Sequence, residues 1–233
     1  EKIRHGGQII DMAILIAIGI NRNGYCEILG VSVSMSEAEI HWAEFLNSLK
    51  ERGLKGVKLI TSDDHKGLKN ARKSVFSGVP WQRCQYHMSE NAQAYSPTKN
   101  MKKEIGSSMR NIFNAPSKNE ALNIAAIVGE EYKKKAPTFA KWLEENIEES
   151  LTIYNFPVEH RKRLRTSNLI ERLNKEIKRR TRVAGIFPNE ESCCRLVSAI
   201  LIEINEEWIT GKRYLNMDCE LFAENITATK LIC

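Results

Sequence analysis

The sequence has no hydrophobic run long enough to cross a lipid bilayer. Its longest apolar stretch, residues 12–20, has nine residues, about half of what a membrane-spanning helix needs. The first residues, EKIRHGGQ, lack the regions of a signal peptide, and the chain does not begin with methionine. We therefore expect a fragment of a cytoplasmic protein that is neither secreted nor bound to a membrane.

The sequence has no regular spacing of cysteines. The six cysteines are Cys26, Cys84, Cys193, Cys194, Cys219 and Cys233. A chain of this length needs no disulfides to hold its core, so we expect reduced thiols. A zinc site needs four ligands, usually in two pairs, and no second pair accompanies Cys84 and His87. We interpret these two as structural. A nucleophilic Cys/His dyad is the weaker alternative, because both would have to face one side of a short strand-like segment.

Positive charge is concentrated in one segment. The chain has 35 Lys and Arg against 29 Asp and Glu, a net charge of +6. Residues 158–182 contain ten Lys and Arg and three Glu, a balance of +7, so the remaining residues sum to −1. Such a segment indicates an anionic partner, most often nucleic acid. A solubilising helix face is the alternative explanation, and charge does not separate the two.

The first third of the chain predicts an α/β fold. Residues 9–20 and 25–34 predict two strands of a hairpin around a turn at residues 21–24. A helix follows Ser36 and ends at Gly53, and residues 56–60 predict a buried strand. Residues 66–76 predict a helix and residues 81–88 a short strand. The order β-β-α-β-α-β indicates an α/β core with one antiparallel hairpin.

Helical patterns replace strand patterns from residue 89 to residue 151. Helices are predicted over residues 101–113, 118–134 and 137–151, with Pro97, Pro116, Pro137 and Pro157 between or beside them. A last helix is predicted over residues 190–208, after the basic segment.

Asp63 directly follows the predicted strand at residues 56–60. Active sites of open α/β sheets gather at the carboxyl ends of strands, so Asp63 is a candidate catalytic residue. The alternative is that Asp63 or Asp64 only caps the next helix.

Glu171 lies in a helical segment with two distinct faces. Apolar side chains share one arc, which predicts that the helix packs against a core; they are Leu169, Ile170, Leu173 and Ile177. Glu171 falls on roughly the opposite side with Lys175, Lys178 and Arg182. Glu171 and Lys175 are an i,i+4 pair in the favourable order. A solvent-exposed helix face with salt bridges therefore explains the charge pattern without any catalytic role for Glu171.

Several separated motifs occur in a fixed order: AIGIN at residues 17–21, SDDHKGL at 62–68, VPWQRCQYH at 79–87, RTSNLIERLN at 165–174 and GIFPN at 185–189. Together they resemble the prokaryotic Mutator-type insertion-sequence transposases, over nearly the whole chain. The resemblance implies a ribonuclease H-like fold, a mixed-sheet core interrupted by an all-helical insertion. It predicts a first core part at 1–88, the insertion at 89–157, and a basic catalytic helix with the rest of the core at 158–233.

The resemblance also implies the site residues. The family uses an Asp-Asp-Glu triad that binds metal; Asp63 matches the second acid and Glu171, 171 − 63 = 108 positions later, the third. Cys84 and His87 match a motif to which we assign a structural role. Lys178 matches a basic position that contacts DNA near the scissile phosphate. With the charge pattern, this predicts DNA binding by Arg163, Arg165, Arg172, Lys175, Lys178, Arg179 and Arg182.

The implied activity is metal-dependent DNA cleavage and strand transfer. Both steps are in-line displacements at phosphorus, for which two Mg²⁺ ions (or Mn²⁺ as substitute) suit a carboxylate site. The expected partners are the terminal inverted repeats of the element, the target DNA and further copies of the chain. The expected setting is the nucleoid in a bacterial cytoplasm.

One part of the family pattern is absent. The first Asp of the triad lies on a strand upstream of the segment that begins here at Glu1, and Asp11 does not match it. We therefore expect a truncated chain that is inactive as given. Two alternatives stay open: a non-catalytic nucleic-acid-binding remnant, and a nuclease of the same fold that hydrolyses without strand transfer.

Overall fold

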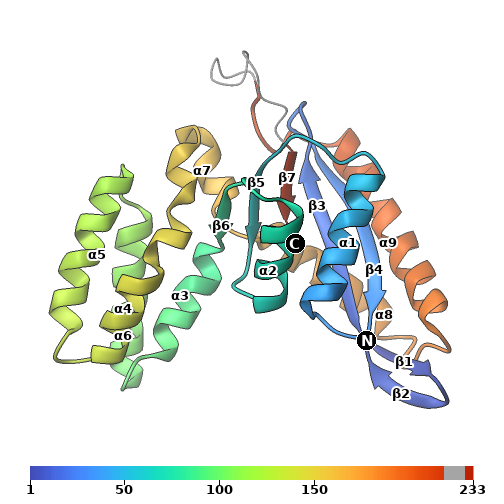
Figure 1. Ribbon diagram of the computed structural model, residues 1–233, viewed down its shortest axis with the longest axis horizontal. Helices are drawn as coiled ribbons and strands as arrows, with labels where there is room; N and C mark the ends of the chain where they lie inside the picture. The colour runs from blue at the N-terminus through green and yellow to red at the C-terminus, as the bar shows by residue number, and fades with distance from the viewer. Residues whose placement is uncertain (218–228, 233) are drawn as a thin grey trace. The chain divides into compact units, whose positions relative to one another are not determined.

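The computed structural model describes residues 1–217 and 229–232, and its chain divides into two compact units (Figure 1). Unit 1 consists of Glu1–Ile60, Asp64–Pro80 and Ser167–Cys233, and unit 2 of Thr61–Asp63 and Trp81–Thr166. Helices and strands both contribute, so the predicted α/β class is confirmed. Cys26, Cys84, Cys193 and Cys194 form no disulfide, and Cys219 and Cys233 lie outside the described residues.

The predicted hairpin forms the centre of unit 1. Strand β3 (Ala13–Ile20) pairs antiparallel with β4 (Cys26–Ser34). The Asn21 side chain accepts hydrogen bonds from the backbone N–H groups of Asn23 and Tyr25, which closes the turn. The sheet order is β4-β3-β7-β5-β6, where β5 is Val57–Ser62, β6 is Trp81–Arg83 and β7 is Thr229–Ile232.

Strand β3 is buried on both faces because helices cover both sides of the hairpin. All residues from 15 to 20 are buried, which explains the long apolar run in the sequence. Helix α1 (Glu39–Glu51) lies in front of β3 and β4 in Figure 1. A Cβ atom at Gly30 would lie 2.9 Å from Leu49 of α1, so glycine permits this close packing.

Helices α8 (Asn168–Thr181) and α9 (Glu190–Thr210) cover the other face. Their core contains twelve buried residues: Ile3, Met12, Ile16, Ile18, Ile170, Leu173, Ile177, Phe187, Cys193, Val197, Ile200 and Leu201. Leu169 packs against it. The predicted apolar face of the segment around Glu171 is therefore confirmed, and the Glu171 side of α8 faces away from this core.

The prediction of one strand over residues 9–20 is wrong. Strand β1 (Lys2–His5) lies before this region, and β2 (Gln8–Asp11) covers its first residues. The two strands pair antiparallel around Gly6 and Gly7. Both glycines have positive φ angles, 55° and 83°, which a tight hairpin turn requires. The buried Met12 separates β2 from β3.

The remaining helices of unit 1 begin close to the predicted positions. Helix α2 (Lys66–Val75) confirms the helix predicted over residues 66–76 and packs against α1. Helix α9 begins at the predicted residue, after the Asn189 side chain accepts a hydrogen bond from the N–H of Ser192.

Unit 2 is mainly helical. It contains α3 (Gln85–Ala94), α4 (Lys99–Phe113), α5 (Lys118–Tyr132), α6 (Pro137–Asn146) and α7 (Val158–Leu164), with 3₁₀ turns at Ile147–Ser150 and Thr152–Asn155. Thr98 and Ser117 cap α4 and α5 through their side chains. The helix predicted over residues 137–151 is too long, because the α-helix ends at Asn146 and 3₁₀ turns continue it.

Strand β6 is anchored to the helical layer of unit 2 by two buried polar side chains. Gln82 donates to the carbonyl of Ser150 at 2.7 Å and accepts from the N–H of Ile153 at 2.7 Å. Arg83, 2% exposed, donates to Asn146 Oδ1 at 3.0 Å and to Glu149 Oε2 at 3.3 Å. These contacts fix the position at which the chain leaves β6. In the part of the chain that the structure describes, no helix is both long and apolar enough to span a membrane.

A charged cluster on α8 and α9 predicts a pH-dependent contribution to stability. Arg179 and Arg180 both bond Glu176, which lowers the pKa of Glu176 from 4.5 to about 2, and Arg180 also pairs with Glu203 of α9. A lowered pKa in the folded state stabilises the protein above pH 4.5, and this stabilisation is lost as the pH falls towards 2.

We expect Glu176→Gln to lower the melting temperature slightly at pH 7, because exposed ion pairs contribute little. The difference from the wild type should shrink between pH 4.5 and 2 and in high salt, as measured by circular dichroism. Glu191→Gln, which removes a long 4.0 Å pair with Arg195, is the matched control. An equal destabilisation at all pH values would show that Glu176 acts through packing.

Candidate functional site

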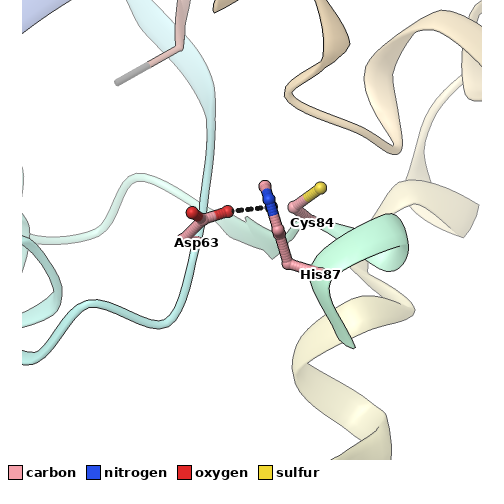
Figure 2. A group of neighbouring side chains, drawn as sticks. All are labelled: Asp63, Cys84 and His87. Atoms are coloured by element: carbon pink, nitrogen blue, oxygen red, sulfur yellow. Dashed lines mark ion pairs between the residues drawn. The ribbon is translucent and has the colours of Figure 1, made fainter. Parts of the chain in front are cut away.

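Three side chains that carry chemistry meet in unit 2. One ligand atom from each of Asp63, Cys84 and His87 lies within 4.8 Å of the other two (Figure 2). Asp63 directly follows β5, Cys84 directly follows β6, and His87 lies in the first turn of α3. Strands β5 and β6 are neighbours in the sheet, and the N–H of Cys84 donates to the carbonyl of Ser62, so the two strands end side by side.

The short strand predicted over residues 81–88 is wrong, and the error matters for this cluster. The strand ends at Arg83 and α3 begins at Gln85, with Cys84 as its N-cap residue. On a strand, residues three apart point to opposite faces, whereas at the start of a helix they lie on the same side. Cys84 and His87 therefore lie on the same side at the start of α3, and Figure 2 shows the His87 ring facing Asp63 with Cys84 beside it.

Buried hydrogen bonds hold the backbone on both sides of the cluster. The N–H of Cys84 donates to the carbonyl of Ser62 at 2.8 Å, and the Trp81 indole N–H donates to Ser62 Oγ at 3.0 Å. The Thr61 hydroxyl donates to the carbonyl of Leu164 at 3.0 Å. The positions of Asp63 and Cys84 are therefore supported by buried hydrogen bonds of both the main chain and neighbouring side chains.

The three side chains differ in exposure and charge. The Asp63 side chain is 49% exposed and that of His87 26%, whereas Cys84 is fully buried. His87 Nδ1 forms an ion pair with Asp63 Oδ1. Hydrogen bonding to Asp63, and then to Cys84, raises the pKa of His87 from 6.5 to about 10 in spite of its partial burial. The contact with Asp63 thus favours the protonated form of His87.

The donor set fits some metal ions better than others. Mg²⁺ prefers hard oxygen ligands, and of these three residues only Asp63 supplies one. A thiolate, an imidazole and a carboxylate together suit Zn²⁺ and similar borderline ions. Asp63 by itself fits a magnesium site, whereas the three residues as a group do not.

Glu171, the other predicted acid, lies in the first turn of α8 and belongs to unit 1. It is partly buried, and the Ser167 hydroxyl lies 3.5 Å from Glu171 Oε1. The structure thus assigns Asp63 and Glu171 to different units and joins Asp63 with Cys84 and His87.

The predicted DNA-binding residues also divide between the units. Arg163 and Arg165 belong to unit 2 and the others to α8 or its C-cap in unit 1. Arg165 is partly buried and donates to the carbonyl of Phe113 and to Asn114 Oδ1. Arg179 is occupied by Glu176.

Four of these cations remain available on one side of α8 and its end. They are exposed and form no ion pair with any residue that the structure describes: Arg172, Lys175, Lys178 and Arg182. With Glu171 they occupy roughly a third of the helix circumference, opposite Ile170, Leu173 and Ile177. We call this stripe the α8 basic face.

The grouping of Asp63 with Cys84 and His87 was missed from the sequence. Asp63 precedes Cys84 by 84 − 63 = 21 residues, so no short motif contains all three. The signal that was available is their position, because Asp63 follows one predicted strand of a β-α-β unit and Cys84 lies in the next. Consecutive strands of such a unit often lie side by side in the sheet.

Comparisons with known proteins agree with the resemblance of the sequence motifs. A family model described as "Transposase, Mutator family" matches residues 1–211. The transposase for insertion sequence element IS406 of Burkholderia multivorans is 52% identical over 218 residues, which are 94% of this chain and 56% of that protein.

Two further relatives are similar over the same extent. The transposase for insertion sequence element ISRM5 of Rhizobium meliloti is 42% identical over 94% of this chain and 54% of that protein. The transposase for IS256 in transposon Tn4001 of Staphylococcus aureus is 36% identical over 93% of this chain and 56% of that protein. The chain spans about half the length of the curated relatives that it matches.

Proposed function

Because this chain belongs to the Mutator family of transposases, we propose that it is the catalytic segment of an insertion-sequence transposase. In this proposal it takes part in metal-dependent cleavage and strand transfer of DNA and has a ribonuclease H-like core. Its substrates are the terminal inverted repeats of the element and the target DNA, and it acts as a homo-oligomer on the bacterial nucleoid.

The position of Asp63 carries the proposal. Its carboxylate follows the buried strand β5, is half exposed, and lies beside the end of β6. In α/β sheets this is the edge at which catalytic groups are held, because rigid strands position them while the loops leave room for substrate. Main-chain hydrogen bonds at Ser62 and Cys84 support that position.

Asp63 and Glu171 would hold Mg²⁺, or Mn²⁺ as its substitute, through carboxylate oxygens. When bound, a pair of such ions activates the attacking oxygen and stabilises the leaving oxygen in an in-line displacement at phosphorus. The α8 basic face would contact phosphates beside Glu171, so that cations offset the charge of the DNA where the carboxylate is placed. These contacts provide affinity and orientation, and they do not select a base sequence.

A crystal structure of the chain with Mn²⁺ tests this assignment. Because metal–oxygen bonds are ~2 Å and paired ions lie ~4 Å apart, the carboxyl groups of Asp63 and Glu171 should lie within roughly 8 Å of each other and share the metal density. The control is Glu176, five residues further along α8, which should carry no Mn²⁺. A separation of more than about twice that distance would reduce Glu171 to a surface residue and overturn the catalytic assignment.

A further inference from the structure

The Asp63–Cys84–His87 cluster has the composition of a transition-metal site. It offers one oxygen, one sulfur and one nitrogen ligand atom within 4.8 Å of each other. Zinc sites in proteins use these three kinds of ligand with bonds of about 2.0–2.3 Å. Ligand atoms at such bond lengths lie about 3–4 Å apart around a tetrahedral ion, so small side-chain rotations would complete the arrangement.

The scaffold of the cluster is rigid. Cys84 is fully buried at the N-cap of α3, and its N–H is bonded to Ser62, the residue before Asp63. His87 is held on the same side of α3 by the helix itself. Buried polar contacts of Gln82 and Arg83 fix the preceding strand. Little conformational entropy would therefore be lost when the three side chains bind one ion.

The cluster is open on one side. Solvent reaches the outer parts of two of these side chains, since that of Asp63 is 49% exposed and that of His87 26%, whereas the atoms that face each other, Asp63 Oδ1 and His87 Nδ1, are buried. Three protein ligands with an accessible fourth position are typical of zinc sites that bind water or substrate, whereas closed sites have four protein ligands. The buried thiol at the base of the cluster excludes Mg²⁺ as the ion that all three residues share.

We propose that Asp63, Cys84 and His87 form a binding site for a borderline divalent transition-metal ion such as Zn²⁺, with water as the fourth ligand. Binding requires a thiolate and a neutral imidazole, so the protons of Cys84 and His87 pass to solvent when the ion replaces the His87–Asp63 ion pair.

A consequence follows if the proposed function holds. Asp63 would then serve both the transition-metal site and the Mg²⁺ site, and an ion held by Cys84 and His87 would withdraw its carboxylate from catalysis. Zn²⁺ would therefore inhibit DNA cleavage. The metal site itself does not depend on the catalytic proposal, because its ligands all lie in unit 2.

Titration of the full chain with Co²⁺, in the absence of DNA, tests the site. We expect tetrahedral Co²⁺ bands in the visible range and a thiolate-to-cobalt charge-transfer band in the near ultraviolet, at one ion per chain. Zn²⁺ should remove both, whereas millimolar Mg²⁺ should not. Cys84→Ser should abolish the charge-transfer band, and Asp63→Asn and His87→Gln should each weaken Co²⁺ binding by at least about tenfold.

Matched variants separate this site from other ligands. Cys194→Ser removes a partly exposed thiol of unit 1, and Asp64→Asn removes the neighbouring carboxylate, which pairs with Lys69. Neither should change the spectrum. Cys84 is buried, so the Cys84→Ser variant is the one that could fail to fold. In that case Asp63→Asn and His87→Gln, which change partly exposed residues, still test the site.

Three results would overturn the site. They are the absence of a charge-transfer band in the wild type, its persistence in a folded Cys84→Ser variant, and displacement of Co²⁺ by Mg²⁺. None of them bears on the catalytic proposal, which is tested with Mn²⁺ and DNA. Conversely, a chain that binds Co²⁺ as expected but places Asp63 far from Glu171 would support this site and contradict the proposed function.

Discussion

Replacing Asp63 by asparagine should abolish metal-dependent nicking of supercoiled DNA, with a rate reduction of at least about 10³-fold, or about 4 kcal/mol in activation free energy. Asparagine keeps the size of the side chain but removes the charge that holds a divalent cation. The reduction should appear with both Mg²⁺ and Mn²⁺, because the two ions use the same carboxylate. Glu171→Gln should have an effect of the same order.

Asp64→Asn is the control for this experiment. Asp64 is the next residue, is exposed, and pairs with Lys69 at 3.0 Å. Its removal deletes the same charge at nearly the same place, and we expect less than a threefold change, of the order of a surface ion pair. Glu176→Gln serves in the same way for Glu171.

The nicking assay should be made in two contexts, since the chain spans about half the length of its relatives. One is the chain alone, and the other is a chimera in which it replaces the matching part of the IS406 transposase. If the wild-type chain nicks DNA in neither context, or if Asp63→Asn nicks as well as the wild type, the catalytic proposal fails. A non-catalytic nucleic-acid-binding remnant would then be the better description.

Removal of three cations from the α8 basic face should weaken DNA binding by about 10²- to 10³-fold near 0.1 M salt. The variant is Lys175→Ala, Lys178→Ala and Arg182→Ala, all exposed and without an ion pair among the described residues. Each phosphate contact contributes about 0.9 to the slope of log K against log salt, so the slope should become shallower by nearly 3. Fluorescence anisotropy with a short duplex at several salt concentrations measures both quantities.

A triple variant of the same charge provides the control. Lys133, Lys134 and Lys135 follow α5 in unit 2, and all three are exposed. Their replacement by alanine removes the same three charges, and we expect a much smaller loss of affinity and an unchanged slope. If both triple variants weaken binding equally, net charge alone explains the binding, and the α8 basic face has no special role.

Elements whose pattern is local could be predicted from the amino-acid sequence. The hairpin of β3 and β4 follows from a long apolar run, the Asn21 turn and an alternating second strand. The two faces of α8 follow from helical periodicity, because the side chains three and four residues apart share a side whatever the helix packs against. The family could also be inferred, since its motifs are short and occur in order along the chain.

Which chemical groups meet depends on long-range contacts in the folded chain. Cys84 and His87 share a side because α3 begins at Gln85, which depends on the anchoring of Gln82 and Arg83 to residues more than 60 positions away. Asp63 joins them because β5 and β6 are neighbours in the sheet. Strand neighbours are chosen by long-range packing, which leaves no periodic signal in the sequence, and so a cluster assembled from three elements emerges only when the chain is folded.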